Sequence, residues 1–316
     1  MNIRKYLLAL ASVSLIAGCG GSDDDNPVNE TAGTIDAVVQ EQGFTALLAA
    51  VEKADLGATL AAPDADVTVF APTDAAFNNL ATRLGFDSAT EMVNALPADT
   101  LRDILTYHVL PSELLAAELS EPANSSQDTL YSFENQPSTL TLESQDGVRI
   151  TDAALTTATV TTADIAASNG VIHAIDKVLV PPGVLNIVQM AQVNPQLSSL
   201  VSAVVSAGLE DTLASAGPLT VFAPTNDAFA AAPSGLTEEQ LRTVLTYHVV
   251  PSLVLAADIP FGTPVNTLAD QAIIINAGTP PTITDTTTIP AIIDATDVRA
   301  SNGVVHVINK VLIPAL

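Results

Sequence analysis

The stretch TVFAPTDAAF, from Thr68 to Phe77, contains a short β-branched run, a proline and a threonine in close succession. Proline has no backbone N–H to donate to a β-ladder, so Pro72 is expected to end a strand. Thr73 is a preferred N-cap residue, so a helix is expected to begin immediately after it. The stretch therefore predicts a strand that passes directly into a helix.

The same stretch returns as TVFAPTNDAF between Thr220 and Phe229. Two further motifs are repeated in the same order: LRDILTYHVLP (Leu101–Pro111) with LRTVLTYHVVP (Leu241–Pro251), and ASNGVIHAIDKVLVP (Ala167–Pro181) with ASNGVVHVINKVLIP (Ala300–Pro314). Only the spacers between the motifs differ in length, and surface loops are where insertions are tolerated. The chain is therefore interpreted as two copies of one domain, with expected bounds 34–182 and 183–316.

Each copy predicts helices first and a sheet second. Apolar residues spaced i, i+3, i+4, i+7 predict a helix over Phe44–Val51 in the first copy and over Leu197–Val204 in the second. Threonine-rich alternating stretches follow within 125–162 and 264–298, and they predict strands and hairpins. This order of elements indicates an α+β fold in each copy.

An Asn-Gly pair stands before the last apolar run of each copy. Asn169-Gly170 and Asn302-Gly303 predict two-residue hairpin turns, because both turn positions require a positive φ. The runs that follow, Val171–Val180 and Val304–Ile313, predict strands that are buried on both faces and ended by proline.

The repeated motifs also pair the candidate structural residues between the copies. They are Thr73 and Thr225, Asp74 and Asn226, Asn169 and Asn302, Gly170 and Gly303, and His173 and His306. Only the second pair changes a charge. If this position accepts a hydrogen bond, asparagine can replace aspartate as the acceptor but brings no charge, so the copies could differ in stability or only one could bind.

Together, TVFAPTDAAF, the Tyr-His pair of LTYHV and SNGVIHAIDKVL resemble the fasciclin-like domain family. The motifs occur in the order of that family, twice, across nearly all of residues 34–316. The resemblance implies that each copy is a wedge of about seven β-strands, with helices from its N-terminal half packed along it. It also implies cell adhesion or surface attachment, and no enzymatic activity of the domain itself.

The Tyr-His pairs, Tyr107-His108 and Tyr247-His248, are candidate interaction or core-organising residues. Each histidine continues an i, i+3, i+4, i+7 apolar series, so it is expected to point inward, stay neutral and hydrogen-bond with both ring nitrogens. The tyrosines lie one position off that face and are expected to be partly exposed. The resemblance implies the alternative of direct recognition, because animal relatives use this motif in integrin binding.

Composition excludes some classes of function. The 316 residues include 35 acidic and 10 basic side chains, which gives a net charge of −25. Such a chain cannot neutralise a run of phosphates, so no nucleic-acid partner is expected. No nucleophile elbow, phosphate loop or metal-ligand spacing occurs, so neither an enzyme nor a cofactor is expected.

The N-terminal residues predict export. Arg4 and Lys5 precede the mostly apolar stretch Tyr6–Ala17, which is too short to span a bilayer permanently, and Cys19 follows. This order resembles a bacterial lipobox. Residues 1–18 are therefore interpreted as a lipoprotein signal peptide, and 19–33 as a lipidated Cys19 with a flexible acidic tether. The alternative is an ordinary signal peptide with an incidental cysteine.

These features predict a lipid-anchored adhesion or interaction module. The resemblance to proteobacterial lipoproteins implies that this module is delivered to the outer membrane, because Gly20 rather than aspartate follows the cysteine. Its expected partners are the membrane, through the lipid anchor, and a protein or polysaccharide on a cell surface or in a matrix. The alternative is a periplasmic structural or carrier module that binds a polysaccharide or an envelope protein. A hydrolase is a third hypothesis that no nucleophile constellation favours.

Overall fold

The computed structural model describes residues 32–119, 125–144, 147–233 and 235–316. The predicted signal peptide, Cys19 and residues 19–31 of the predicted tether lie outside these ranges. Within them, no helix is both long and apolar enough to cross a bilayer.

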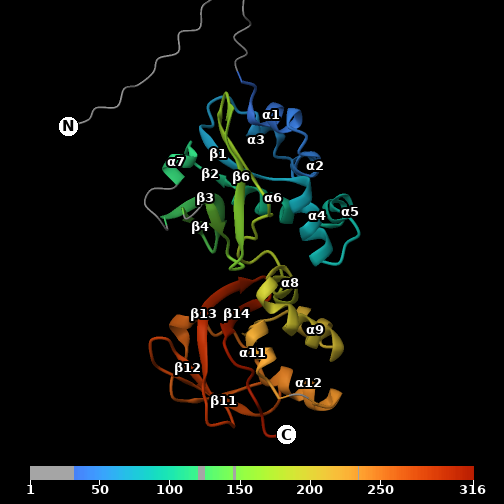
Figure 1. The fold of residues 1–316 in the computed structure, drawn as a ribbon, viewed down its shortest axis with the longest axis vertical. Helices are drawn as coiled ribbons and strands as arrows, with labels where there is room; N and C mark the ends of the chain where they lie inside the picture. The colour runs from blue at the N-terminus through green and yellow to red at the C-terminus, as the bar shows by residue number, and fades with distance from the viewer. Residues whose placement is uncertain (1–31, 120–124, 145–146, 234) are drawn as a thin grey trace, which may run out of the picture. The chain divides into compact units, whose positions relative to one another are not determined.

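In the first copy, helices precede most of the strands, as the motif order predicts (Figure 1). The helices are α1 (Ile35–Glu41), α2 (Thr45–Lys53), α3 (Gly57–Leu60), α4 (Asp74–Arg83), α5 (Ala89–Ala95), α6 (Ala98–Tyr107) and α7 (Ala116–Leu119). The strands are β1 (Val67–Pro72), β2 (Val109–Leu110), β3 (Ser125–Phe133), β4 (Gln136–Glu143), β5 (Arg149–Thr151), β6 (Thr157–Ala167) and β7 (Gly170–Ile175).

The second copy repeats this order. Its helical segments are α8 (Ile187–Val193), η1 (Pro195–Leu197), α9 (Ser198–Ser206), α10 (Glu210–Ala214), α11 (Asn226–Ala230), α12 (Glu238–Tyr247) and η2 (Ala256–Asp258). Its strands are β8 (Leu219–Pro224), β9 (Val249–Val250), β10 (Pro264–Asn266), β11 (Ala272–Asn276), β12 (Thr282–Thr284), β13 (Ala291–Ala300) and β14 (Gly303–Ile308).

Each copy holds a seven-stranded sheet with one parallel pair, which lies one strand in from an edge of the sheet. The strand orders are β2-β1-β7-β6-β5-β4-β3 and β10-β11-β12-β13-β14-β8-β9. The pairs β1–β7 and β8–β14 are parallel, and the other pairs are antiparallel. The fold is therefore α+β with about seven strands in each copy, as the resemblance implies.

The parallel strands are buried on both faces. Every residue of β1 and β7 is buried, with Val69 and Ile172 in the core on the helix side and Phe70 and Ile175 in a second core against the outer strands. In Figure 1, helices α2, α4 and α5 lie to one side of strands β3 and β4 of the same copy. A sheet layer sandwiched in this way explains the unbroken apolar runs of the sequence.

Two details of the sequence interpretation need correction. The hairpin between β6 and β7 exists, but Ala167 pairs with Gly170, so Ser168 and Asn169 form the turn. Asn169 does not have a positive φ, and Gly170 is the first residue of β7, with φ of 147°. A Cβ at Gly170 would lie 2.1 Å from the Val67 carbonyl oxygen, so the glycine is required by the close approach of β1.

The strand after this turn is also shorter than predicted. β7 ends at Ile175, and β14 ends at Ile308, although the apolar runs continue. Beyond the end of β7, buried side chains replace the neighbouring strand as hydrogen-bond acceptors. The backbone N–H groups of Leu179 and Val180 donate to His108 and Asp152. An apolar pattern indicates that a segment is buried. It does not show whether the backbone N–H groups of that segment bond to a neighbouring strand or to buried side chains.

Candidate functional site: the Tyr-His helices and their buried network

Tyr107 is the last residue of α6 and is fully buried, so the prediction of partial exposure is wrong for it. Its hydroxyl donates to the Thr139 carbonyl of β4 at 3.0 Å and accepts from the Ala153 N–H at 3.1 Å. Its ring meets Tyr131 edge-on, with centroids 6.1 Å apart. Burial raises the pKa of the Tyr107 hydroxyl, which therefore stays neutral. This tyrosine ties the helix to the outer strands.

His108 is the C-cap of α6 and uses both ring nitrogens inside the core. Its Nδ1 lies 2.7 Å from the Ile104 carbonyl oxygen and must donate to it, while Nε2 accepts from the Leu179 N–H at 2.8 Å. One donor and one acceptor require the neutral imidazole. Burial lowers the pKa of His108 to about 4, in agreement with that tautomer.

The second copy builds the same arrangement. Tyr247 and His248 are buried, so the expected exposure of this tyrosine is wrong as well. The Tyr247 hydroxyl donates to the Ala272 carbonyl at 3.0 Å. His248 contacts the Val244 carbonyl through Nδ1 and accepts from the Leu312 N–H through Nε2, both at 2.8 Å. Burial lowers the pKa of His248 to about 4.

His173 and His306 lie on the buried strands β7 and β14 and have the opposite tautomer. The His173 Nε2 donates to the Leu114 carbonyl at 2.9 Å, and its Nδ1 accepts from the Asp164 N–H at 3.2 Å. The His306 Nε2 donates to the Val254 carbonyl at 2.8 Å, and burial lowers the pKa of this ring. All four histidines therefore bind backbone groups of the protein.

The threonine and aspartate of the opening motif cap two different helices. Thr73 accepts from the Ala76 N–H at 3.2 Å and caps α4, and Thr225 caps α11 in the same way. Asp74 instead accepts from the Ala46 N–H at 2.9 Å, at the start of α2. Asn226 accepts from the Ser199 N–H of α9 at 2.8 Å, so the amide does replace the carboxylate as the acceptor.

The asparagines of the hairpin turns act through their side chains. Asn169 accepts from the Ile35 N–H at 2.9 Å and donates to the Leu60 and Ala62 carbonyls at 2.8 and 2.7 Å. It thereby fixes the start of α1 and the end of α3 to the sheet. Asn302 accepts from the Ile187 N–H at 2.9 Å and holds two carbonyls near α10 in the same manner.

Sequence reasoning missed a buried aspartate in each copy. Asp152 is 4% exposed and accepts from Thr156 and from the N–H groups of Ala154 and Val180 at 2.8–3.1 Å. Burial raises its pKa. Asp285 accepts from Thr287, from the Ile313 N–H and from the Lys310 ammonium, the last at 2.6 Å. Despite burial, these bonds hold the pKa of Asp285 below its usual value.

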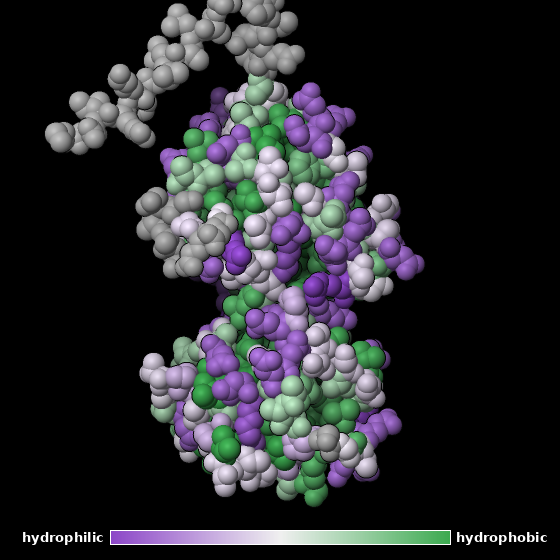
Figure 2. All heavy atoms as spheres, in the orientation of Figure 1, coloured by the Kyte–Doolittle hydropathy of each residue, from purple (hydrophilic) through white to green (hydrophobic). Residues whose placement is uncertain are grey.

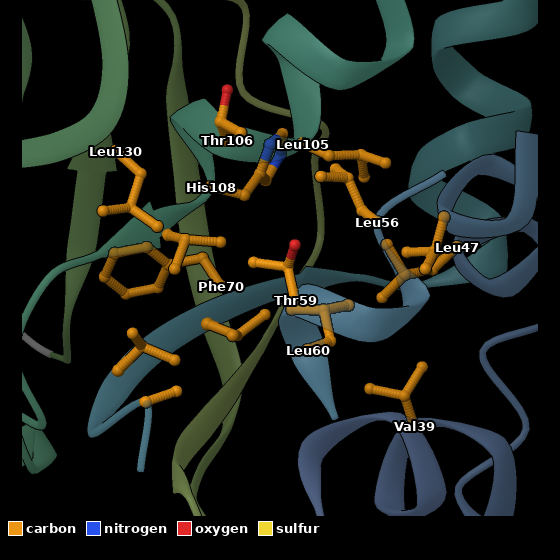
Figure 3. Close-up of a pocket in the computed structure, with 15 residues that line it drawn as sticks. Val39, Leu47, Leu56, Thr59, Leu60, Phe70, Leu105, Thr106, His108 and Leu130 are labelled. Carbon is orange, nitrogen blue, oxygen red and sulfur yellow. The ribbon is translucent and has the colours of Figure 1, made fainter. Parts of the chain in front are cut away.

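A small apolar cavity lies beside each histidine of the pair. The first has a volume of about 70 Å³ and is lined by His108 and by side chains of α1, α2 and β1, among which Val39, Leu47 and Phe70 are labelled in Figure 3. Its counterpart beside His248 has about 30 Å³. Ligand sites commonly have volumes of about 300–1,000 Å³, so neither cavity has the size of a cofactor site.

Comparison with known proteins agrees with the duplicated geometry. A sequence model of the fasciclin domain matches residues 42–181 and again residues 195–314. The chain belongs to the fasciclin domain family. It carries two fasciclin domains in tandem, and domains of this family are typically adhesion modules rather than enzymes.

Similar proteins occur in bacteria and in animals. Protein sll1483 of Synechocystis is 41% identical over 140 residues, which cover 42% of this chain and 75% of that protein. Transforming growth factor-beta-induced protein ig-h3 of Oryctolagus cuniculus is 30% identical over 258 residues, which cover 78% of this chain but only 34% of that protein. Fasciclin homologues of this kind are extracellular or secreted.

A solved structure of a FAS1 domain pair from the insect cell adhesion molecule Fasciclin I is also similar. It covers 89% of this chain and 95% of its own, with 19% sequence identity and a TM-score of 0.42. Among the residues described in the present structure, no group of three or more histidine, cysteine, aspartate or glutamate side chains could hold a metal ion.

Proposed function

We propose that this fasciclin protein is a lipid-anchored adhesion or interaction module of the bacterial envelope. The observation that carries the proposal is the tandem pair of fasciclin domains, matched over 42–181 and 195–314. Each domain closes its core around the same Tyr-His arrangement, so both copies are built to the same design. A pair of similar rigid modules suits attachment, because two weak contacts on one tether reinforce each other.

The burial of the Tyr-His pairs bears on where a partner binds. Tyr107, His108, Tyr247 and His248 are each at most 2% exposed, and their polar atoms bind the protein's own backbone. We therefore assign them the core-organising role and place recognition on the outer surface. On the face drawn in Figure 2, hydrophilic and hydrophobic residues are interspersed over both copies.

Adhesion is tested with a soluble fragment that begins at Gly20, because residues 32–316 form one compact unit that this fragment keeps whole. Its retention on immobilised cells and on their purified extracellular polysaccharide is measured with and without calcium. We expect saturable retention that survives the double substitution Tyr107→Phe/Tyr247→Phe at a temperature where the variant is folded. Absence of saturable retention on both supports would refute adhesion. Loss of retention in the folded variant would return recognition to the Tyr-His helices.

Anchoring is tested on the full chain. The proposal expects mass spectrometry to find acyl chains on Cys19 and expects Cys19→Ser to move the protein from the membrane fraction to the soluble fraction. An unmodified Cys19 in a soluble protein would show that the N-terminal segment is an ordinary signal peptide.

A second candidate function is a periplasmic structural or carrier module. It is favoured by a polar cleft of about 510 Å³ lined by Arg83, Asp176 and Lys177, because a cleft of this size can hold a small ligand. Protease treatment of intact cells separates the two. A surface adhesin is cut from intact cells, whereas a periplasmic module is cut only after the outer membrane is opened. An integral-membrane marker with a known surface loop serves as the control.

A further inference from the structure

The equivalent lysines of the two copies have different partners. Lys310, in NKVL, donates to the buried Asp285 at 2.6 Å and to Thr287 at 2.7 Å. Lys177, in DKVL, has no hydrogen bond or salt bridge to any described residue. The reason lies in Asp152, which already accepts from Thr156 and from backbone N–H groups. Asp152 still attracts Lys177 through space, but its oxygens are already hydrogen-bonded within their own loop and it forms no hydrogen bond or salt bridge with the ammonium.

Lys177 lines a polar cleft of about 510 Å³. The cleft walls come from α4, from the turn before β6, from the end of β7 and from the segment that joins α8 to η1. Arg83, in the last turn of α4, lines the same cleft, and its only hydrogen bond among the described residues is a marginal one of 3.5 Å to the Gln192 carbonyl.

These two cations are a notable concentration of positive charge in this chain. The whole protein has 10 basic side chains against 35 acidic ones, so two cations without a salt bridge in one cleft favour an anionic ligand there. Burial lowers the pKa of Lys177, the Asp152 and Asp176 carboxylates oppose that change, and the nearby Arg83 adds to it, in agreement with the position of both cations in one cleft. An anion placed between them would relieve that repulsion.

Asp176 also lines the cleft and opposes a highly charged anion. It is exposed, and its carboxylate accepts one hydrogen bond, from the Thr159 N–H at 2.7 Å. The side-chain amides of Asn79 and Gln196 line the cleft without a hydrogen bond to any described residue. The cleft thus combines two cations, one carboxylate and two free amides. This set matches one negative charge surrounded by hydroxyl groups.

We propose that this cleft binds a single uronic acid residue at the end of an otherwise neutral glycan. The sugar carboxylate would lie between Lys177 and Arg83, and the ring hydroxyls would bind Asp176, Asn79 and Gln196. Leu155, which is 40% exposed, supplies an apolar surface for the C–H face of the ring. A volume of about 510 Å³ falls in the range of small-ligand sites, and the net charge of −25 disfavours a polyanion.

The second copy cannot form this site. Lys310 is neutralised by Asp285, and α11 ends at Ala230, so no arginine corresponds to Arg83. The proposal goes beyond adhesion and does not depend on it, because the sugar assay uses no cells. A protein that fails to be retained on cells could still bind the sugar, and the reverse also holds.

The test titrates the fragment from Gly20 with methyl β-D-glucuronide and follows the backbone amide chemical shifts. We expect saturable shifts centred on Lys177 and Gln196, none around Lys310, and binding at least about tenfold weaker for methyl β-D-glucoside, which lacks the carboxylate. Equal binding of the two sugars overturns the proposal. Inorganic phosphate that binds the same residues as tightly as the glucuronide overturns the assignment of a sugar.

Matched variants locate the site. Arg83→Gln changes an exposed residue and is expected to weaken glucuronide binding about tenfold without changing the melting temperature. Arg149→Gln removes the same charge from β5 of the same copy, outside the cleft, and is expected to bind as the unchanged protein does. Equal affinities of the two variants refute the site. Lys177→Arg is expected to retain binding, and complete loss in that folded variant would also count against it.

Discussion

At the scale of single residues, the buried polar side chains of this protein bind backbone groups. His108 bridges the Ile104 carbonyl and the Leu179 N–H, and His248 bridges the Val244 carbonyl and the Leu312 N–H. Each imidazole thereby supplies a hydrogen-bond partner to a backbone N–H group that lies beyond the end of a strand and has no partner in the sheet. Both ring nitrogens therefore serve the fold. Protonation of the ring would turn Nε2 into a donor and break its bond to the backbone N–H.

This neutral state predicts how stability depends on pH. Burial lowers the pKa of His248 in the folded protein to about 4, below the ordinary value of about 6.5 in the unfolded chain. The unfolded chain therefore binds the extra proton first, and stability falls as the pH falls from about 6.5 toward 4. Between pH 7 and pH 5 the loss is about 2 kcal/mol for this histidine. Urea unfolding at pH 5, 6 and 7 measures it.

His248→Gln serves as the control, because glutamine does not titrate in this range. The difference in unfolding free energy between the protein and this variant is expected to narrow as the pH falls from 7 to 5. A difference that stays constant across these pH values would contradict the assignment. The comparison also cancels Asp152, whose pKa is raised by burial and whose effect on stability has the opposite sign.

The two buried tyrosines predict unequal costs for the same substitution. Tyr107 donates to Thr139 and accepts from Ala153, whereas Tyr247 has one bond, to Ala272. Tyr107→Phe removes the partner of two part-buried backbone groups and is expected to cost about 2–3 kcal/mol, against about 1–2 kcal/mol for Tyr247→Phe, which loses one such bond. Chemical denaturation of both variants, with unchanged far-UV circular dichroism, is the measurement. Equal costs would show that the Ala153 N–H finds another partner.

At the scale of elements, the parallel strand pair of each sheet sets the strictest requirement. The close approach of β1 to Gly170, and of β8 to Gly303, leaves no space for a side chain. The neighbouring Asn169 and Asn302 connect the same turn to helices α1 and α8. One short motif therefore fixes strand, turn and helix together.

Gly170→Ala tests this requirement. The added Cβ would meet the Val67 carbonyl oxygen at 2.1 Å, and the backbone has a φ of 147°, so a loss of about 3 kcal/mol or more is expected. Gly57→Ala is the matched control, because a Cβ there meets nothing within 4 Å and φ is not positive. It is expected to be neutral or to stabilise the helix by up to about 1 kcal/mol. Thermal unfolding of both variants decides, and equal melting temperatures would refute the packing argument.

At the scale of the whole molecule, residues from both copies contact each other. Arg299 of β13 forms an ion pair with Glu134, and its guanidinium lies 5.1 Å from the centre of the Phe133 ring. The Gly183 N–H donates to the Arg299 carbonyl at 3.0 Å, and Asn194 donates to the Ala154 carbonyl at 3.0 Å. The two copies are therefore joined by an ion pair and hydrogen bonds in addition to the short connecting segment.

A double-mutant cycle over Arg299→Met and Glu134→Gln measures this coupling. The Arg299 side chain is 17% exposed and that of Glu134 is 61% exposed, so solvent screens the pair. We expect a coupling free energy of about 0.5–1 kcal/mol, which falls as salt is added. Strictly additive single substitutions, at low salt, would show that the ion pair does not hold the copies together.

The sequence alone determined the class of fold, the duplication and the family. Periodic apolar residues, proline and capping threonines are local signals, and they correctly predict α2, α9, β1, β8 and the caps at Thr73 and Thr225. The inward direction of His108 and His248 also follows from helical spacing. These features depend on residues a few positions apart, where geometry is the same in every fold.

Only the tertiary structure decided which buried polar atoms meet. It placed the Tyr107 hydroxyl against Thr139, ended β7 at Ile175 and gave Gly170 its steric reason. It also paired Lys310 with Asp285 while leaving Lys177 at a polar cleft, although the two lysines have nearly the same neighbours in sequence. Hydrogen-bond partners such as these are tens of residues apart along the chain, so periodicity carries no information about them, and only the packed sheet brings them within 3 Å.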